Sequence, residues 1–299
     1  MSTTAPLRKR LQSLRSEYES LRKGKDSLLR LIDEAEVPES VYNSNAIENS
    51  TLTLKETEKI LLEMEVSRNV SLREVFEAKN LARITEYIRD KAAQEDLTKD
   101  SILLLHRMLM GNINDNIAGR FRTSGEYVRV GTHIAPAPEQ VEPMIEKILD
   151  DYYSNLESYF VDKIAVSHLN FETVHPFIDG NGRIGRVIIN YQLLRMGFPC
   201  IIIRDKEKKE YYRSFNAYHD AGNTKPMEKV VALALMEALH KRIAYLKGEE
   251  IIALSGYAGK HNKSAPALLN AARRQNIPAF REKGIWKIGA GFKHKGALS

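Results

Sequence analysis

The chain has 299 residues and a formal net charge of +6, and 43% of its residues are hydrophobic. This length accommodates one sizeable domain and a small second one. A single cysteine, Cys200, excludes a disulfide framework and a cysteine-based zinc site. No apolar signal segment opens the sequence, and no run approaches the roughly 18 apolar residues that span a bilayer. We therefore expect a cytoplasmic protein without membrane contact.

The pattern of residues 1–40 predicts a helical segment, because leucines recur every seven residues with further large apolar residues between them. These residues are Leu7, Leu14, Leu21, Leu28, Leu11 and Tyr18. Three heptads are short for an autonomous coiled coil. We expect the segment to pack on the central domain or on a partner subunit, which leaves a homo-oligomer open.

The segment SNAIEN, residues 44–49, places Ser44 four residues before Glu48, so on a helix the two side chains share one face. The same spacing also occurs at an ordinary helix start. Helical spacing of apolar residues returns over 71–110, and a further helix is predicted over 167–174. Within the first of these ranges, His106 is expected on the helix surface or in the core rather than as a ligand.

Residues 119–144 predict a loop, a short hairpin and an exit ended by proline. Strand formers lie between two glycines, and two prolines block continuation of the strand. The residues concerned are Tyr127, Val128, Val130, Gly125, Gly131, Pro136 and Pro138. Strand signals are otherwise confined to the C-terminal tail.

The stretch HPFIDGNGRIGR, residues 175–186, has a composition suited to nucleotide phosphates. A glycine turn that runs into a helix presents free N–H groups and the positive end of the helix dipole to an anion. Arg183 and Arg186 share a helix face, where guanidinium groups can grip phosphate oxygens. Asp179 can hold a hard cation such as Mg²⁺, and His175 can take a proton near neutral pH. The alternative is a tight loop with a capping histidine and solvated arginines.

The C-terminal tail carries the positive charge of the chain. Residues 260–299 hold nine Lys or Arg and one Glu, a net of +8, so the first 259 residues carry about −2 of the total of +6. An Ala/Leu helix is followed by IPAFR at 277–281 and by Trp286. This arrangement resembles the winged modules of excisionase type, and its charge indicates DNA as a partner. A basic docking or dimerisation element that binds no DNA remains an alternative.

Residues 175–186 resemble the signature of the Fic family, HPFxDGNGRxxR, and all nine specified positions are met. A pattern of this length is far more specific than a lone GxGxxG. Fic proteins mostly transfer AMP from ATP to a Ser, Thr or Tyr hydroxyl of a protein. The resemblance therefore implies a protein adenylyltransferase with ATP as co-substrate, Mg²⁺ as cofactor and a protein as target.

The resemblance also assigns roles to residues. It implies that His175 is the general base and that Asp179 binds Mg²⁺. Within the phosphate-binding turn it implies that Asn181 fixes the α-phosphate, Arg183 the β-phosphate and Arg186 the γ-phosphate. The whole ATP-binding set of this turn is Gly180, Asn181, Gly182, Arg183, Ile184, Gly185 and Arg186.

Two further segments acquire roles by the same resemblance. SNAIEN is similar to the family's inhibitory motif [S/T]xxxE[G/N], formed here by Ser44, Glu48 and Asn49, in which the glutamate pairs with Arg186 and removes the γ-phosphate contact. The hairpin resembles the Fic flap, which pins the target by adding a strand to it. Nucleotide contacts outside the main motif are implied for Val130, Gly131, Thr132, His133 and Tyr211, whereas His219 stands where relatives often have Asn.

We therefore predict a mainly α protein with a Fic-fold helical core, a β-hairpin flap and a small C-terminal winged-helix-like module. The expected division is an N-terminal helical segment at 1–40, a Fic domain with its inhibitory helix at 41–252, and the basic module at 258–299. The expected function is AMP transfer that is autoinhibited by Glu48. Removal of AMP, transfer of another nucleotide or phosphate group, and a DNA-binding regulator with a nucleotide-sensing core stay open as alternatives.

Overall fold

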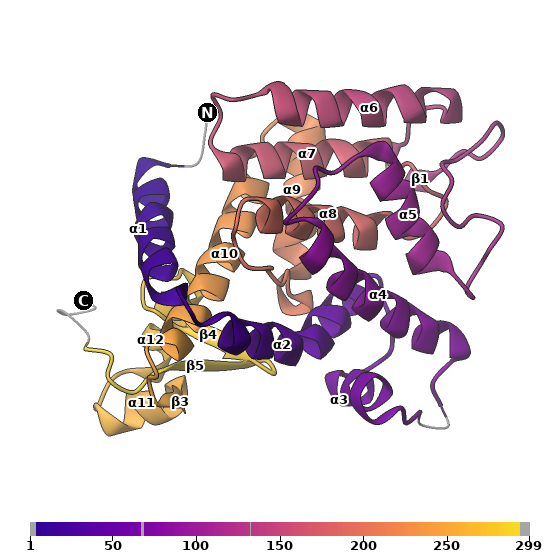
Figure 1. Cartoon of the computed structure of the whole chain (residues 1–299). Helices are drawn as coiled ribbons and strands as arrows, with labels where there is room; N and C mark the ends of the chain where they lie inside the picture. The colour runs from indigo at the N-terminus through magenta and orange to yellow at the C-terminus, as the bar shows by residue number, and fades with distance from the viewer. Residues whose placement is uncertain (1–3, 67–68, 132, 294–299) are drawn as a thin grey trace. The chain divides into compact units, whose positions relative to one another are not determined.

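The structure, a computed structural model, describes residues 4–66, 69–131 and 133–293. Within these ranges the chain is mainly helical, with twelve α-helices and two small antiparallel sheets (Figure 1). This confirms the predicted fold class. The chain forms two compact units: Val37–Val231, and Thr4–Glu36 together with the chain from Ala232 onward. No helix of the described ranges is both long enough and apolar enough to cross a bilayer.

The first unit is a helical bundle that carries the motif residues. Its helices are the later part of α2 (Asp26–Ile47), α3 (Leu54–Glu58) with a π turn (Lys59–Glu63), α4 (Leu72–Lys91), α5 (Lys99–Met110), α6 (Pro138–Ser154), α7 (Phe160–Val174), α8 (Asn181–Arg195), α9 (Lys208–Ala221) after a 3₁₀ turn (Asp205–Glu207), and the start of α10 (Lys225–Leu246). α6 packs on α7, and α7 on α8 (Figure 1). Apolar side chains of α4, α5, α7 and α8 form the core, among them Ile84, Leu105, Phe171 and Ile188.

Side-chain caps explain where several of these helices begin. The Ser71 hydroxyl accepts the N–H of Glu74 at the start of α4, and Thr98 accepts the N–H of Ser101 at the start of α5. Such caps satisfy N–H groups that have no partner within the helix. The start of α8 differs, because its N-cap is Gly180 and no side chain caps it. The first N–H groups of α8 therefore remain available to an anion.

The predicted hairpin is present between α5 and α6. β1 (Arg129–Val130) pairs antiparallel with β2 (His133–Ile134), with Val130 opposite His133. Gly131 in the turn has a φ of 59°, in the left-handed region that glycine adopts readily. Val130 is 40% exposed and Ile134 is 70% exposed, so apolar side chains of the hairpin face solvent.

The second unit contains the predicted winged arrangement. A three-stranded antiparallel sheet in the order β3-β5-β4 is formed by β3 (Ile251–Ala253), β4 (Phe280–Glu282) and β5 (Ile285–Gly289). α11 (Leu254–Lys260) and α12 (Ala265–Arg273) precede the β4–β5 hairpin. These elements share a hydrophobic core, to which Leu268, Ile277 and Ile288 contribute.

The N-terminal segment is helical, as expected. It contains two helices, because α1 (Ala5–Arg22) ends before a turn in which Gly24 has a φ of 70°, and α2 begins at Asp26. Its first part makes contacts within the second unit, where Arg10 donates to Asn276 at 3.2 Å and Lys247 pairs with Glu17 at 2.6 Å.

The two units also divide the chain differently from the boundaries expected at residues 40, 252 and 258, because the N-terminal helix shares a unit with the C-terminal elements. Buried charge contributes to this unit, since the fully buried guanidinium of Arg242 pairs with Asp33 and with Glu36. Which segments fold as independent domains stays a prediction.

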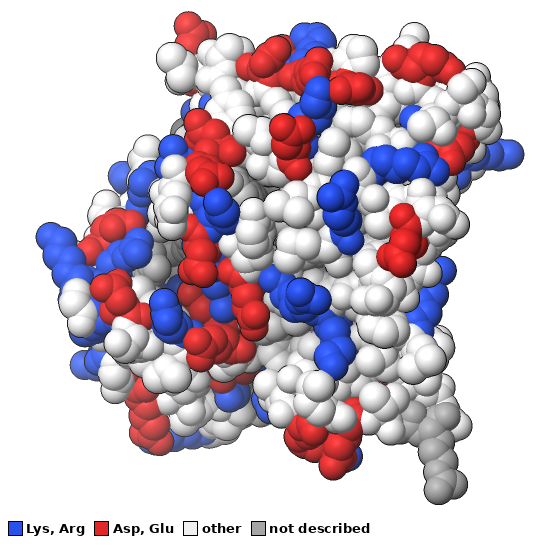
Figure 2. Space-filling model, turned by 45° about the vertical axis from the view of Figure 1, so that its right-hand side comes forward, with Lys and Arg blue, Asp and Glu red and all other residues white. Residues whose placement is uncertain are grey.

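Charges on the face of the molecule drawn in Figure 2 are mixed rather than segregated. On the face drawn in Figure 2, Lys and Arg side chains lie among Asp and Glu side chains. Several of these charges pair across elements, as Lys99 does with Glu142 at 2.5 Å and with Glu146 at 2.6 Å. Such exposed pairs contribute little to stability, typically about 0–1 kcal/mol each.

Candidate functional site

The motif residues lie in a turn that joins α7 to α8. α7 ends at Val174, and His175 follows with a φ of 48°, in the left-handed region. The turn closes at Gly180, whose φ is 83° and where a Cβ would lie 2.8 Å from Cδ2 of Leu109. Glycine is therefore required here both by backbone conformation and by close packing against α5.

The side chain of Asn181 closes this turn instead of facing a phosphate. Its Oδ1 accepts the N–H of Phe177, and its Nδ2 donates to the Phe177 carbonyl, both at 2.8 Å. Asn181 is 2% exposed, so the amide has no further surface. A contact of Asn181 with the α-phosphate stays a prediction, for which the backbone N–H groups of Asn181 and Gly182 at the start of α8 are the available donors.

His175 is a partly buried, neutral imidazole, with 17% of its side chain exposed. Burial lowers its pKa to about 4, which keeps the ring unprotonated at neutral pH. Its Nδ1 lies 3.4 Å from the carbonyl oxygen of Glu172. A carbonyl can only accept, so this contact places the proton on Nδ1 and leaves Nε2 with a free lone pair. The ring can therefore receive a proton at Nε2.

Two further residues hold this turn in place through hydrogen bonds to its backbone. The sequence analysis did not predict this role for either of them. Arg122 is buried and donates Nε to the His175 carbonyl at 2.9 Å and Nη2 to the Val174 carbonyl at 3.2 Å. His106 accepts the N–H of Gly119 and donates Nε2 to the Asp179 carbonyl, both at 3.0 Å. His106 is fully buried, which confirms that it is a core residue. Neither contact has a signature in residue spacing, because each joins segments far apart in the chain.

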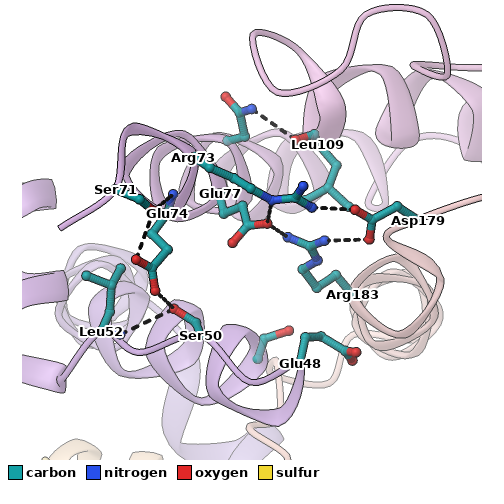
Figure 3. Close-up of polar contacts among 12 residues, drawn as sticks. Glu48, Ser50, Leu52, Ser71, Arg73, Glu74, Glu77, Leu109, Asp179 and Arg183 are labelled. Atoms are coloured by element: carbon teal, nitrogen blue, oxygen red, sulfur yellow. Dashed lines mark hydrogen bonds and ion pairs between the residues drawn. The ribbon is translucent and has the colours of Figure 1, made fainter.

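Asp179 and Arg183 belong to a cluster of four charges (Figure 3). The Arg183 guanidinium bonds Asp179 Oδ1 at 3.1 Å and Glu77 Oε1 at 3.0 Å. Arg73, from the first turn of α4, bonds Asp179 Oδ2 at 2.5 Å and Glu77 at 3.1 Å. Burial alone would raise the pKa of Asp179, but the two guanidinium groups lower it, so Asp179 is ionised. Glu77 and Arg73 were missed, although their i, i+4 spacing is visible in LREVFE.

Arg186 faces the segment SNAIEN. Its Nε donates to the Ser44 hydroxyl at 2.9 Å, and its Nη2 donates to the Ser44 carbonyl at 2.7 Å and to Glu48 Oε1 at 2.8 Å. Burial alone would lower the pKa of Arg186, but the Glu48 carboxylate raises it. The ion pair that the resemblance implies is therefore present. Asn49 has a φ of 68°, which explains why Gly or Asn suits this position.

A second carboxyl, Glu172, lies in the same region without being ionised. Its side chain is 11% exposed, and its buried Oε1 has no hydrogen-bond partner among the described residues. Burial, reinforced by the charge of Glu48, raises the pKa of Glu172 to about 8. Its Oε2 lies 3.8 Å from Nδ1 of His175, and since both groups are neutral at pH 7 this is not an ion pair.

The other expected nucleotide contacts are distributed unevenly. Ile184 is fully buried in the core, so only its backbone can face a ligand. Gly185 also lies inside, because a Cβ there would be 2.2 Å from Glu172 Oε1. Val130 and Gly131 are in the exposed hairpin. Thr132 lies outside the described residues.

His133 and Tyr211 are occupied by protein contacts. His133 donates Nε2 to the Thr173 carbonyl at 2.9 Å, which ties the hairpin to α7, and it stacks on His219. Tyr211 is 2% exposed, and its hydroxyl lies 2.8 Å from Nε2 of His168. The centroid of the Tyr211 ring lies 5.9 Å from Cζ of Arg186. The expected contact of Tyr211 with adenosine stays a prediction.

Comparisons with known proteins agree with this geometry. A model of the Fic/DOC family matches residues 96–193. A protein adenylyltransferase Fic of Nematostella vectensis is 32% identical over 227 residues, which cover 75% of this chain and 52% of the relative. A protein adenylyltransferase fic-1 of Caenorhabditis elegans is 31% identical over 212 residues, which cover 69% of this chain and 41% of the relative.

A solved structure of a Fic domain-containing signaling protein from Bacteroides thetaiotaomicron is similar to this one, with a TM-score of 0.74 and 26% identity. The similarity covers 81% of this chain and 98% of that one. The chain contains a domain of the Fic/DOC family and has the corresponding helical fold. It spans about half the length of the curated relatives that it matches.

The state of Glu172 predicts an unusual dependence of stability on pH. The unfolded chain loses the Glu172 proton near the ordinary pKa of 4.5, whereas the folded protein retains it to about 8. The native state is therefore destabilised as pH rises between these values, because the unfolded state binds fewer protons. Between pH 5 and pH 8, the free energy of unfolding of the wild type should fall by a few kcal/mol more than that of Glu172→Gln, at roughly 1.4 kcal/mol per pKa unit.

Denaturant unfolding at pH 5 and pH 8 measures this effect. The exposed Glu157→Gln is the matched control, and it should follow the wild type at both pH values. Identical pH profiles for wild type and Glu172→Gln would show that Glu172 is ionised in the folded protein.

Proposed function

We propose that this protein transfers AMP from ATP to a Ser, Thr or Tyr hydroxyl of a protein and that Glu48 holds it in an inhibited state. The observation that carries the proposal is the uncapped start of α8 beside a neutral His175, with Arg183 and Arg186 on the same helix. Uncapped N–H groups stabilise charge on a transferring phosphoryl group. The names of the relatives, protein adenylyltransferase Fic, support the same activity.

In the proposed reaction, Nε2 of His175 takes the proton of the target hydroxyl. The hydroxyl oxygen then forms a bond to the α-phosphorus, the bond to the bridging oxygen breaks, and pyrophosphate leaves. A negatively charged phosphate beside the imidazole favours its protonated form, which raises its basicity when nucleotide is bound. The exposed edge of the β1–β2 hairpin suits a target segment that adds to it as a further strand.

Mg²⁺ fits the chemistry of this site. Among the described residues no group of three His, Cys, Asp or Glu side chains is placed to hold a metal by itself. Mg²⁺ requires only one or two carboxylates together with substrate phosphates, and Asp179 is an ionised carboxylate beside the phosphate-binding turn. When bound there, Mg²⁺ would neutralise phosphate charge. Asp179 would hold it, and Arg183 would hold phosphate oxygens.

Inhibition follows from the contacts of Arg186. Its Nε and Nη2 are both engaged, by Ser44 and by Glu48. A γ-phosphate therefore competes with the Glu48 carboxylate for the same guanidinium, and loss of this contact leaves the triphosphate misaligned for transfer.

His175→Ala should lower AMP transfer by about 10²- to 10⁴-fold, the usual effect of removing a general base, while ATP still binds. His175→Asn is the matched control, because Asn tolerates the left-handed backbone at this position. Both variants should lose transfer of label from [α-³²P]ATP to the same extent and retain the affinity of wild type for ATP. Undiminished labelling by either variant would remove His175 from this role.

Glu48→Gly should raise incorporation of AMP, whereas Arg186→Ala should not. Both changes break the ion pair between these residues, but only the first leaves a guanidinium for the γ-phosphate. Incorporation from labelled ATP at matched protein concentration measures the difference. If Glu48 served only to stabilise the helix end, Glu48→Gly would show equal or lower incorporation.

The second unit supports a second candidate activity, binding of duplex DNA. Cations are exposed on and around α11 and α12, namely Lys260, Lys263, Arg273 and Arg274. Not all of the tail's charge is available, because the buried Arg281 pairs with Glu237 at 2.6 Å and Lys287 pairs with Glu282 at 2.6 Å. The exposed cations are the groups that would release counterions from a phosphate backbone.

Replacing Lys260, Lys263, Arg273 and Arg274 together by Gln should abolish DNA binding and leave AMP transfer intact. Gel retardation of a DNA duplex at low and at moderate salt measures DNA binding. The affinity of the wild type for the duplex should fall steeply as the salt concentration rises. No salt-sensitive retardation by wild type would favour the docking or dimerisation alternative.

A further inference from the structure

Asp179 has no free carboxylate oxygen in the charge cluster of Figure 3. Oδ1 accepts from Arg183 at 3.1 Å, and Oδ2 accepts from Arg73 at 2.5 Å. The cluster is electrically balanced, because these two guanidinium groups face two carboxylates, Asp179 and Glu77. A divalent cation that approaches Asp179 therefore meets an oxygen already bonded to a cationic group.

The two arginines differ in how they are held. The Arg183 side chain is 4% exposed and is fixed by Glu77 and Asp179 together. The Arg73 side chain is 57% exposed and reaches Asp179 from the solvent side. Arg73 also keeps a second partner on its own helix, since its Nε bonds Glu77 one turn further along α4 at 3.1 Å. Arg73 can thus leave Asp179 without losing its only acceptor, whereas Arg183 cannot move without leaving a buried charge unpaired.

We propose that Arg73 is a positioning residue that competes with the divalent cation for Oδ2 of Asp179. In the absence of the cation it holds the carboxylate in place beside the phosphate-binding turn and balances its charge. When the cation and nucleotide enter, Arg73 gives up Oδ2 and stays on Glu77, while Arg183 keeps Oδ1 and faces the phosphates. The inference rests on the proposed function, because it takes Asp179 as the metal ligand.

α4 is well suited to place Arg73 in this way. Glu74, adjacent in sequence, accepts from the backbone N–H of Thr51 at 2.7 Å and from the Ser71 hydroxyl at 2.9 Å. These bonds fix the first turn of α4 against the segment that follows the inhibitory motif. Arg73 therefore projects from an anchored helix start and not from a loop.

The test is the affinity of the full-length protein for Mn²⁺, used as a probe of the divalent site. Mn²⁺ is titrated in the presence of α,β-methylene-ATP, which cannot be cleaved at the α–β position, and free Mn²⁺ is read by electron paramagnetic resonance. Arg73→Ala and Arg73→Gln should each bind Mn²⁺ roughly two- to tenfold more tightly, as expected for release from a half-exposed, charge-assisted ion pair. The Gln variant retains the side-chain stem, so it separates loss of charge from loss of packing.

Two controls make the outcome decisive. Arg83→Ala removes the same charge from an exposed position ten residues further along α4, and it should leave the Mn²⁺ affinity unchanged. Asp179→Asn should abolish the binding. If wild type binds through Asp179 but Arg73→Ala and Arg73→Gln do not bind more tightly, or if Arg83→Ala has the same effect, the competition is overturned while the proposed function stands. If wild type binds no Mn²⁺ or binds it independently of Asp179, the assigned metal role fails and this inference fails with it.

Discussion

The two hydrogen bonds between the Asn181 side chain and the Phe177 backbone are the interaction on which the rest of the site depends. They close the turn between α7 and α8 without using any side chain to cap α8. A capping Ser or Asp at Gly180 would satisfy the same N–H groups that an anion needs. By closing the loop from inside, Asn181 stabilises the turn and keeps the helix start available. His175, whose backbone is in the left-handed region, lies at the other end of the same turn.

The two arginines of the motif each have a carboxylate partner from a different element. Arg183 is paired with Glu77 of α4, and Arg186 with Glu48 after α2. Breaking a buried pair by removing one partner typically costs about 3–5 kcal/mol. The arginines are therefore held in place before any phosphate arrives. In the proposed function, a phosphate that enters would have to replace or share these carboxylates.

Much of the site could be predicted because its residues are contiguous. Residues 175–186 and 44–49 carry their geometry in their spacing, and the structure brings Arg186 to Ser44 and Glu48. The contacts that were missed join distant segments: Arg122 to the carbonyls of the turn, and Arg73 to Asp179. No local pattern reports a contact of this kind, since it depends on how helices pack.

Details that the sequence analysis left open also have local physical causes. The leucine repeat predicted a helical segment, and Gly24 allows a left-handed turn that divides it into α1 and α2. Likewise, no local pattern shows that Tyr211 is buried and that its hydroxyl is hydrogen-bonded to His168. The hairpin and the winged sheet were predictable, because glycines and prolines mark their turns.

Glu172 shows why the inhibited arrangement can keep two carboxyl groups near one arginine. If Glu172 were ionised, Glu48 and Glu172 would repel one another in a region of low dielectric. Burial instead favours the protonated form of Glu172, whose pKa is raised to about 8, so Arg186 faces one negative charge and not two. The Glu48 side chain is 33% exposed, whereas the Glu172 side chain is 11% exposed. In the proposed function, Glu48 is therefore the carboxyl group that a γ-phosphate would replace, because it is the more exposed of the two.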